Sequence, residues 1–470
     1  MIQINFSFLL LLGGVLGFLA LFINSDIYTF ILLSVLILGL VLLRVSINLL
    51  FYFLILIRPS LDILGNYNIV LSPDLPSINI AGIVAIISIL VSFIIIYRSK
   101  ISILSIPLSF IFILLFLIYI IFTIISTYPV DSINELIRVL SFLLMYFTGY
   151  VLIQSKDDLI NFVKVVIMSS IIPVIVGYIQ LFNGAGLYTN PGFENRIAGT
   201  FGHPNVLGYF LLIILTLMIY LFFEKNIIKN PISKYIFSIY GALLAILLIA
   251  TYTRGAWIGL FILLAGVSLI KFPRKTLIYT AIIIPIVGIF MAMYFWMQQT
   301  IWYELTPIED IPVISRVIGL FNRDPSDSII WRQVMWSDMY NKALTRPIIG
   351  FGTGTIEIIV EEVRGVALGA LEVHNDYIRI FVELGIIGLI TYILFILSIF
   401  YSLIIRIKSR QDTLFLVMSF IVLAIYLSSI WDNLLRQTAV MWMFFAILGA
   451  VFKYHSIRSQ QSPEFPATEV

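Results

Sequence analysis

Long apolar blocks alternate with short polar connections along nearly the whole 470-residue chain. The blocks are about 17 residues or longer, the length that an α-helix needs to cross the hydrocarbon core of a bilayer. The pattern predicts membrane-spanning helices at 5–23, 27–43, 80–97, 103–126, 133–153, 159–181, 204–223, 235–253, 255–270, 276–297, 376–405, 412–430 and 436–454. The sequence therefore predicts an all-α, polytopic transmembrane helical bundle.

Basic residues indicate which connections face the cytoplasm, because Lys and Arg in short loops stay on that side. They gather in alternate connections, at 98–100, 156–164, 225–234, 271–275, 406–410 and after 453. The intervening connections are poor in lysine, at 127–132, 182–203, 298–375 and 431–435. We therefore expect residues 1–297 to hold about 10–11 spans, 298–375 to form a large loop outside the cytoplasm, 376–454 to add the last spans, and 455–470 to be a cytoplasmic tail, disordered from Ser459 onward.

Two stretches bear on the path of the chain. The short apolar stretch 45–57 is either a span of its own or the end of a long, kinked second helix, so the total is about 13 or 14 spans and the side of the N-terminus stays open. The stretch 236–270 would be roughly 50 Å long as one helix, which exceeds a core of about 30 Å. We expect it to break at Thr253-Arg254-Gly255, on the outside.

Composition excludes several classes of protein. Hydrophobic residues make up 61% of the chain and charged residues 11%, whereas a soluble domain carries about 25% charged residues. The net charge of +3 gives no basis for binding nucleic acid. The chain has no cysteine, which excludes disulfides, thiolate catalysis and iron–sulfur clusters.

The outside loop is rich in arginine and poor in lysine. It holds one lysine, Lys342, beside Arg316, Arg323, Arg332, Arg346 and Arg364. The planar guanidinium group suits phosphate recognition. Any single arginine of this loop is explained as well by an ion pair on a wet surface, with Asp338, Glu357, Glu361 or a similar neighbour. The residues of 331–345 have helical spacing, which predicts an amphipathic helix on the membrane surface. The run Gly350–Gly354 is either a simple turn or a turn that offers backbone N–H groups to an anion.

Other polar residues stand at the predicted helix ends. Arg254, at the break between two apolar blocks, either snorkels to water or meets an anion. Asn375 and Asp376 suit the start of a helix, whereas capping needs no histidine at position 374. His203 precedes another helix start on the outside, and His455 lies near the tail. Arg379 and Glu383, four residues apart, are expected to pair with each other.

Several short motifs, in this order, resemble one family. They are Arg196-Ile-Ala-Gly-Thr-Phe-Gly-His-Pro-Asn205, Thr251-Tyr-Thr-Arg-Gly-Ala256, Trp331-Arg332 with Pro347-Ile-Ile-Gly-Phe-Gly352, and His374-Asn-Asp-Tyr377 followed by Glu383-Leu-Gly385. The chain thereby resembles the superfamily of O-antigen polymerases and O-antigen ligases over roughly 190–390. In one position it departs from the family, because Thr253 stands where a serine is usual before the membrane arginine.

The resemblance implies a fold and an activity. The fold would be a bundle of the GT-C type whose large extracytoplasmic loop contains short helices. The enzyme would be a multi-pass protein of the cytoplasmic membrane. It would take glycan from an undecaprenyl-pyrophosphate carrier on the periplasmic or extracellular side and pass it to a sugar hydroxyl. The acceptor is another lipid-linked glycan for a polymerase and lipid A-core for a ligase, and a chain-length regulator protein is a possible partner.

The resemblance also assigns roles to residues. His374 would be the general base, and Arg254 and Arg332 would bind the leaving pyrophosphate, without a metal ion or any other cofactor. Arg196, His203, Asn205 and Asn375 would bind substrate. This agrees with the chemistry, because arginines can offset the charge of a departing diphosphate and histidine is a base suited to neutral pH.

Three other classes compete with this interpretation. A lipid-linked oligosaccharide flippase would share the spans but would need charged residues along a central cavity, and mid-membrane charges are few. A cell-wall polymerase of the shape, elongation and division family would also have an outside loop, yet its patterns are missing. A structural or receptor protein leaves the outside arginines and histidine unexplained. Between polymerase and ligase, the His-Asn-Asp-Tyr run favours the polymerase.

Overall fold

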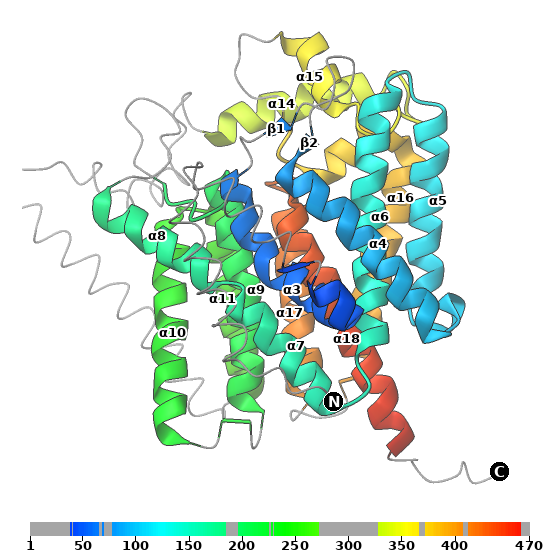
Figure 1. Cartoon of the computed structure of the whole chain (residues 1–470). Helices are drawn as coiled ribbons and strands as arrows, with labels where there is room; N and C mark the ends of the chain where they lie inside the picture. The colour runs from blue at the N-terminus through cyan, green and yellow to red at the C-terminus, as the bar shows by residue number, and fades with distance from the viewer. Residues whose placement is uncertain are drawn as a thin grey trace, which may run out of the picture.

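The computed structural model describes residues 38–39, 41–64, 68–69, 78–184, 196–224, 227–228, 230–271, 328–365, 372–407 and 412–461. Within these ranges the chain forms a bundle of helices (Figure 1). The α helices are α3 (Ile47–Ile57), α4 (Ile80–Ser99), α5 (Ser109–Ile124), α6 (Pro129–Leu152), α7 (Lys156–Met168), α8 (Ile171–Asn183), α9 (Pro204–Phe223), α10 (Pro231–Ala250), α11 (Arg254–Lys271), α14 (Ser328–Ala343), α15 (Ile356–Arg364), α16 (Asp376–Ile404), α17 (Thr413–Ser428) and α18 (Thr438–Gln461).

Short elements join these helices. The 3-10 helices are η1 (Arg58–Leu64), η2 (Ile103–Ser105) and η5 (Leu434–Arg436). The strands β1 (Asn68–Ile69) and β2 (Ile78–Asn79) pair antiparallel, with Asn68 opposite Asn79. Among the described residues, 7 helical stretches are long and apolar enough to cross a membrane, one of them formed by α7 and α8 together. The protein is therefore an all-α, polytopic membrane protein, as the sequence predicts.

The apolar blocks predict the helices closely wherever the chain is described. The predicted break at Thr253–Gly255 is confirmed, since α10 ends at Ala250 and α11 begins at Arg254. The stretch 159–181 differs, because the helix is interrupted between Met168 and Ile171. Helix α18 continues to Gln461, so the tail does not begin at Ser459. The predicted spans 5–23 and 276–297, almost all of 27–43, and the loop residues 298–327 lie outside the described residues.

The two ends of the bundle differ in character. The loop end carries α14 and α15, and the tail end is where α18 finishes (Figure 1). Basic residues contact neighbouring helices at the tail end: Lys156 pairs with Glu224, and Lys453 lies over the ring of Tyr150. The C-terminal end of α3 points to the loop end, because the Thr200 hydroxyl donates to the Pro59 carbonyl at 2.6 Å.

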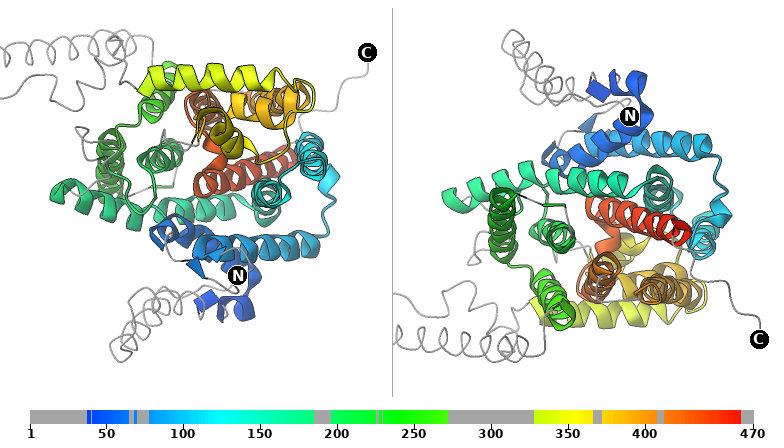
Figure 2. Two further views of the ribbon diagram at one scale, coloured as in Figure 1. Left: turned by 90° about the horizontal axis from the view of Figure 1, so that it is seen from above. Right: turned by 90° about the horizontal axis from the view of Figure 1, so that it is seen from below.

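Helix α18 lies in the centre of the bundle (Figure 2) and packs most extensively against α6. Two glycines allow this close approach. A Cβ atom on Gly149 would lie 2.0 Å from the Ala446 carbonyl oxygen, and one on Gly449 would lie 2.0 Å from the Tyr146 carbonyl oxygen. Small residues at a helix crossing let two backbones meet within a membrane. The α6–α18 pair is thus a rigid support for the segments at its loop end.

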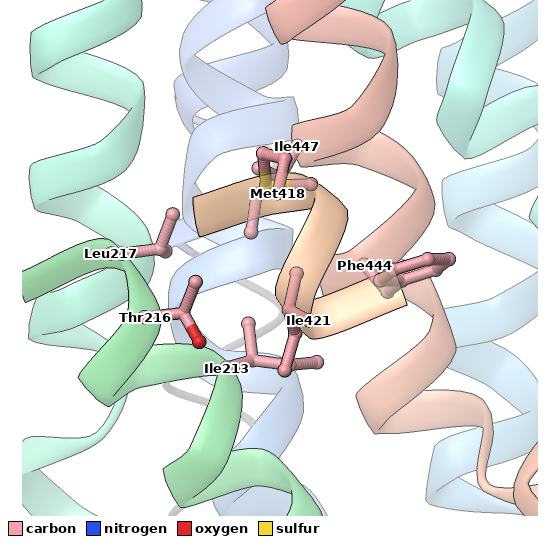
Figure 3. Close-up of a pocket in the computed structure, with 7 residues that line it drawn as sticks. All are labelled: Ile213, Thr216, Leu217, Met418, Ile421, Phe444 and Ile447. Atoms are coloured by element: carbon pink, nitrogen blue, oxygen red, sulfur yellow. The ribbon is translucent and has the colours of Figure 1, made fainter. Parts of the chain in front are cut away.

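A small apolar pocket lies between α9, α17 and α18 (Figure 3). Its lining residues are Ile213, Thr216, Leu217, Met418, Ile421, Phe444 and Ile447. The one hydroxyl among them, on Thr216, donates to the Leu212 carbonyl of its own helix. The pocket therefore offers no polar group to orient a substrate, and it is a packing gap in the bundle.

Helix α16 is divided at Gly385, whose φ of 61° and ψ of −163° are not helical. Beside this break lies Pro347–Gly352, which we call the elbow. The N–H groups of Phe351 and Gly352 donate to the Val382 and Glu383 carbonyls at 3.0 and 2.8 Å, and the Ile386 N–H donates to the Pro347 carbonyl at 2.8 Å. The elbow thus satisfies the backbone groups that the break sets free. The possibility that this glycine-rich turn presents its N–H groups to an anion is wrong for Phe351 and Gly352.

Candidate functional site

Four segments meet at the loop end, and one hydrogen-bonded chain of side chains connects them. Arg196 donates from Nη2 to Asn205 Oδ1 at 2.8 Å, and Asn205 donates from Nδ2 to Asp432 Oδ2 at 2.6 Å. The other carboxylate oxygen, Asp432 Oδ1, lies 3.5 Å from His374 Nδ1. Residues separated by more than two hundred positions in the sequence are thereby joined. The structure brings together the predicted residues Arg196, Asn205 and His374, with Asp432 between them.

Arg196 is buried and used mainly to hold protein groups. Its Nε donates to the Thr251 carbonyl at 3.0 Å, and its Nη2 also reaches the Thr253 hydroxyl at 3.3 Å. It therefore fixes the turn between α10 and α11 against the start of α9. These contacts indicate that Arg196 positions other protein groups. The substrate contact that the resemblance implies for Arg196 stays a prediction.

Asp432 is buried, at 2% exposure, and stays ionised there. Burial alone would raise its pKa, but the hydrogen bond and charge of His374, with the charge of Arg332, help to outweigh burial and hold the pKa below its ordinary value. A carboxylate with a lowered pKa keeps its pairing at neutral pH, and the pairing is lost only as the pH falls through the folded-state pKa. Asp432 can therefore hold His374 in one orientation through the physiological range.

The backbone at His374 is strained, with a φ of 52°. A non-glycine residue with positive φ is uncommon and needs neighbours that enforce it. Here both following residues are fixed: the Asn375 N–H donates to Asn433 Oδ1 at 2.9 Å, and the Asp376 N–H donates to the Ser429 carbonyl at 2.9 Å. The segment before α16 is thus fastened to the connection between α17 and α18.

Asn375 acts as the predicted helix cap. Its Oδ1 accepts from the N–H groups of Tyr377 and Ile378 at 2.9 and 3.0 Å, which satisfies donors that have no partner inside the helix. The capping interpretation therefore accounts for Asn375, and a role in substrate binding stays a prediction.

His203 also caps a helix, since its Nδ1 accepts from the Asn205 N–H at 3.1 Å. Burial lowers its pKa to about 4, and the nearby charges of Arg196 and His374 act in the same direction while Asp432 opposes them. The imidazole is therefore neutral at physiological pH. It cannot supply positive charge to a phosphate.

Arg332, on α14, lies close enough for its charge to act on Asp432 and on Tyr209. Its Nε is buried and has no hydrogen-bond partner among the described residues. Arg254 is the first residue of α11 and is half-buried. It follows Thr253, whose hydroxyl lies 3.3 Å from Asn205 Oδ1. Arg332 therefore stands beside the chain of side chains that ends at His374, and Arg254 follows directly on Thr253, which contacts that chain.

A second cluster of buried charges lies next to the site. Arg379 pairs with Glu135 of α6 at 3.0 Å and with Asp376 at 3.4 Å. Asp376 Oδ2 in turn accepts from the Leu435 N–H at 3.0 Å. The predicted pairing of Arg379 with Glu383 is wrong, because Arg379 takes these two partners while Glu383 Oε1 accepts from the Ile356 N–H at 3.4 Å. The cluster ties α6 and α16 to the connection that carries Asp432.

Two further arginines of the predicted outside loop, Arg346 and Arg364, lie within the described residues, and both have protein neighbours. Arg364 lies 3.7 Å from Asp338, and Arg346 stacks on the ring of Phe351. These contacts fit the expectation of ordinary surface pairing. Within the described residues, no group of three or more His, Asp or Glu side chains is arranged to hold a metal ion.

Comparison with known proteins adds a family to this geometry. The family model described as O-antigen ligase matches residues 239–393. These residues belong to the O-antigen polymerase and ligase superfamily. The superfamily match runs from α10 to the middle of α16 and includes Arg254, Arg332 and His374. The protein is thus a membrane enzyme that transfers glycan. No curated protein matches the chain.

The superfamily match does not include Arg196, His203, Asn205 or Asp432. The motifs in the sequence indicated the first three, but Asp432 was missed. It stands alone in a short connection, Trp431-Asp432-Asn433, which resembles an ordinary turn between two spans. The signal that could have revealed it is its position: a carboxylate between two apolar blocks, at the same predicted end of the bundle as His374.

Proposed function

We propose that this protein is a membrane glycosyltransferase that polymerises oligosaccharide repeat units carried on undecaprenyl pyrophosphate. The observation that carries the proposal is the contact of His374 with the buried carboxylate of Asp432, beside Arg332. A histidine oriented by a carboxylate, with guanidinium groups close by, suits deprotonation of an alcohol and release of a diphosphate. The same set of residues would serve a ligase, so the acceptor distinguishes the two enzymes.

In the proposed reaction His374 takes the proton of an acceptor hydroxyl through Nε2, because Nδ1 faces Asp432. The hydroxyl oxygen forms a bond to the anomeric carbon of the donor sugar. The bond from that carbon to the phosphate oxygen breaks, and its electron pair leaves with the diphosphate. Asp432 stabilises the imidazolium that results, and Arg254 and Arg332 stabilise the charge on the leaving group.

We further propose that the loop end faces the periplasm or exterior and that the tail end faces the cytoplasm. This rests on the basic residues at the tail end, among them Lys156, Arg406, Lys453 and Arg458, since basic connections stay cytoplasmic. A diphosphate lipid held in the outer leaflet would then present its charged group at the depth of the site. The proposed catalytic residues would thus lie at the boundary between membrane and water because the diphosphate of the lipid donor lies there.

A reconstituted reaction distinguishes the polymerase from the ligase. The purified protein in proteoliposomes receives the lipid-linked repeat unit as the sole substrate, and the products are separated by length. We expect a ladder of longer lipid-linked chains. If chains do not lengthen and product appears only after lipid A-core is added, the protein is a ligase and the polymerase proposal is wrong.

The same assay tests the proposal that no metal ion takes part. We expect the ladder to keep its rate in the presence of a strong chelator of divalent ions, because arginines supply the positive charge. Activity that is lost with the chelator and regained with a divalent ion would contradict metal-independent transfer.

Removing the guanidinium of Arg332 should slow transfer strongly. Arg332→Gln should lower kcat by about 10²–10³, the loss found when a group that stabilises developing negative charge is removed. Arg332→Lys should retain part of the rate, because it keeps the charge but loses the planar fork. Arg364→Gln is the matched control, since Arg364 stands in the same outside region and faces Asp338. Equal kcat values for Arg332→Gln and the control would remove Arg332 from the site.

A further inference from the structure

The outside face of the elbow is apolar. Leu344, just before it, is 50% exposed, and Ile348 and Ile349 within it are 62% and 48% exposed. Large aliphatic side chains gathered on an outside loop need an apolar surface to cover them. The neighbouring surface of α16 indicates what that cover is.

Helix α16 is 29 residues long, which corresponds to about 43 Å and exceeds a hydrocarbon core of about 30 Å. The break at Gly385 divides it. Residues 386–404 contain no charged residue and would extend about 28 Å, the length of one crossing. The charged residues Asp376, Arg379 and Glu383 all lie before the break. The hydrocarbon core therefore begins close to Gly385.

The elbow lies at this same level, because Pro347 accepts from Ile386 and Gly352 donates to Glu383. The first turns of the crossing expose Ile386, Ile387 and Ile390, at 40%, 42% and 51%. Such side chains on a spanning helix face lipid. The elbow also lies directly against α16, because a Cβ atom at Gly385 would lie 2.3 Å from the Ile348 carbonyl oxygen. The exposed isoleucines of the elbow thus extend the apolar, lipid-facing surface of α16.

The charges around the elbow are arranged as at a membrane interface. Arg346 and Lys342 flank the ring of Phe351, at 4.9 and 5.3 Å from its centre. Lys342 also pairs with Glu362 of α15 at 2.9 Å. Long basic side chains extend from apolar surroundings to the headgroup region. Helix α14, which leads into the elbow, lies along the edge of the bundle (Figure 2).

We propose that the elbow is a membrane-inserted anchor of the outside region, with Ile348 and Ile349 in the acyl-chain region of the adjoining bilayer leaflet. The partner is the lipid bilayer itself. The anchor fixes the depth of α14 and so of Arg332, which sits on the same helix. This inference goes beyond the proposed function and does not depend on which glycan is transferred.

Single-cysteine labelling tests the proposal directly, because the chain contains no cysteine of its own. Ile348→Cys and Ile349→Cys are each made in the full-length protein, labelled with a nitroxide and reconstituted into phospholipid vesicles. Collision with oxygen, which concentrates in the bilayer, is compared with collision with a water-soluble nickel chelate. Leu397→Cys, at an exposed position of the α16 crossing, is the lipid control, and Glu361→Cys, at an exposed position of α15, is the water control.

We expect the oxygen-to-nickel ratio at 348 and 349 to exceed that at 361 severalfold and to approach the ratio at 397. A ratio equal to that at 361 would put the elbow in water and overturn the proposal. Low access of both reagents to 348 and 349 would mean that protein covers the elbow, either a second copy of this chain or another chain. That result would also overturn the proposal. None of these readings requires transfer activity, so failure here is distinct from failure of the proposed function.

Discussion

His374→Asn should lower the rate of glycan transfer by about two to four orders of magnitude, the usual contribution of a general base. Asparagine cannot take a proton from a sugar hydroxyl at neutral pH, yet it tolerates the left-handed backbone that His374 adopts at a φ of 52°. The local fold should therefore survive, and the loss should be chemical. The measurement is the initial rate of transfer by purified protein in proteoliposomes.

The matched control for this variant is His455→Asn. His455 lies near the end of α18, where its ring packs edge-on against Phe415, at the opposite end of the bundle from His374. The control should transfer glycan at nearly the original rate. A His374→Asn protein as active as the control would remove His374 from the reaction, and with it the proposed mechanism.

Asp432 extends this test, because it acts through His374 rather than on substrate. Asp432→Asn should lower kcat while leaving KM nearly unchanged, since the carboxylate orients the base and offsets its charge in the transition state. Asp432→Glu should recover part of kcat, because it restores a negative charge near His374 Nδ1. If Asp432 were only structural, Asp432→Asn would lower the amount of folded protein, but the folded fraction would keep the original kcat.

The helices of the bundle could be predicted from the sequence because each depends on a local signal. A block such as 204–223 is apolar except for Asn205 and Thr216, and Pro204 in its first turn and His203 before it mark its start. The helix break before Arg254 followed from length alone. The interruption after Met168 was not predicted, because the apolar residues on both sides outweigh the two serines, Ser169 and Ser170, at which it occurs.

The site was predictable only where its residues belong to motifs. His374, Arg254 and Arg332 stand in short recognisable runs, but their geometry depends on partners elsewhere in the chain. Asp432 reaches His374 across 58 positions, and Glu135 reaches Arg379 across 244. No periodicity in one sequence reveals such a pair, because the two partners lie far apart in the chain. The assignment of Glu383 to Arg379 failed for this reason.

The glycines of the elbow and of α16 give the prediction with the largest effect on the fold. Gly385→Ala should destabilise the protein markedly. The backbone at Gly385 lies in a region that only glycine adopts readily, which costs another residue about 1–3 kcal/mol. In addition, the new Cβ would lie 2.3 Å from the Ile348 carbonyl oxygen and 2.7 Å from the Ile349 nitrogen. The elbow would have to move away from the helix.

That movement has a further cost, because it would break the backbone hydrogen bonds between the elbow and α16. Each is worth about 1 kcal/mol net, and more where the groups are left without water. The unfolding temperature of the purified protein in detergent should fall by several degrees or more. The fall should come with loss of transfer, since the elbow follows the helix that carries Arg332.

Gly241→Ala separates this effect from a general intolerance of glycine replacement. Gly241 lies within α10, and a Cβ there would meet only Met218 Cε at 3.6 Å, an ordinary contact. Alanine is a better helix former than glycine, so the unfolding temperature of this control should hold or rise. If Gly385→Ala unfolds at the same temperature as the control and transfers glycan normally, the backbone of α16 is not divided at Gly385. The level of the hydrocarbon core, which we place at that residue, would then need another landmark.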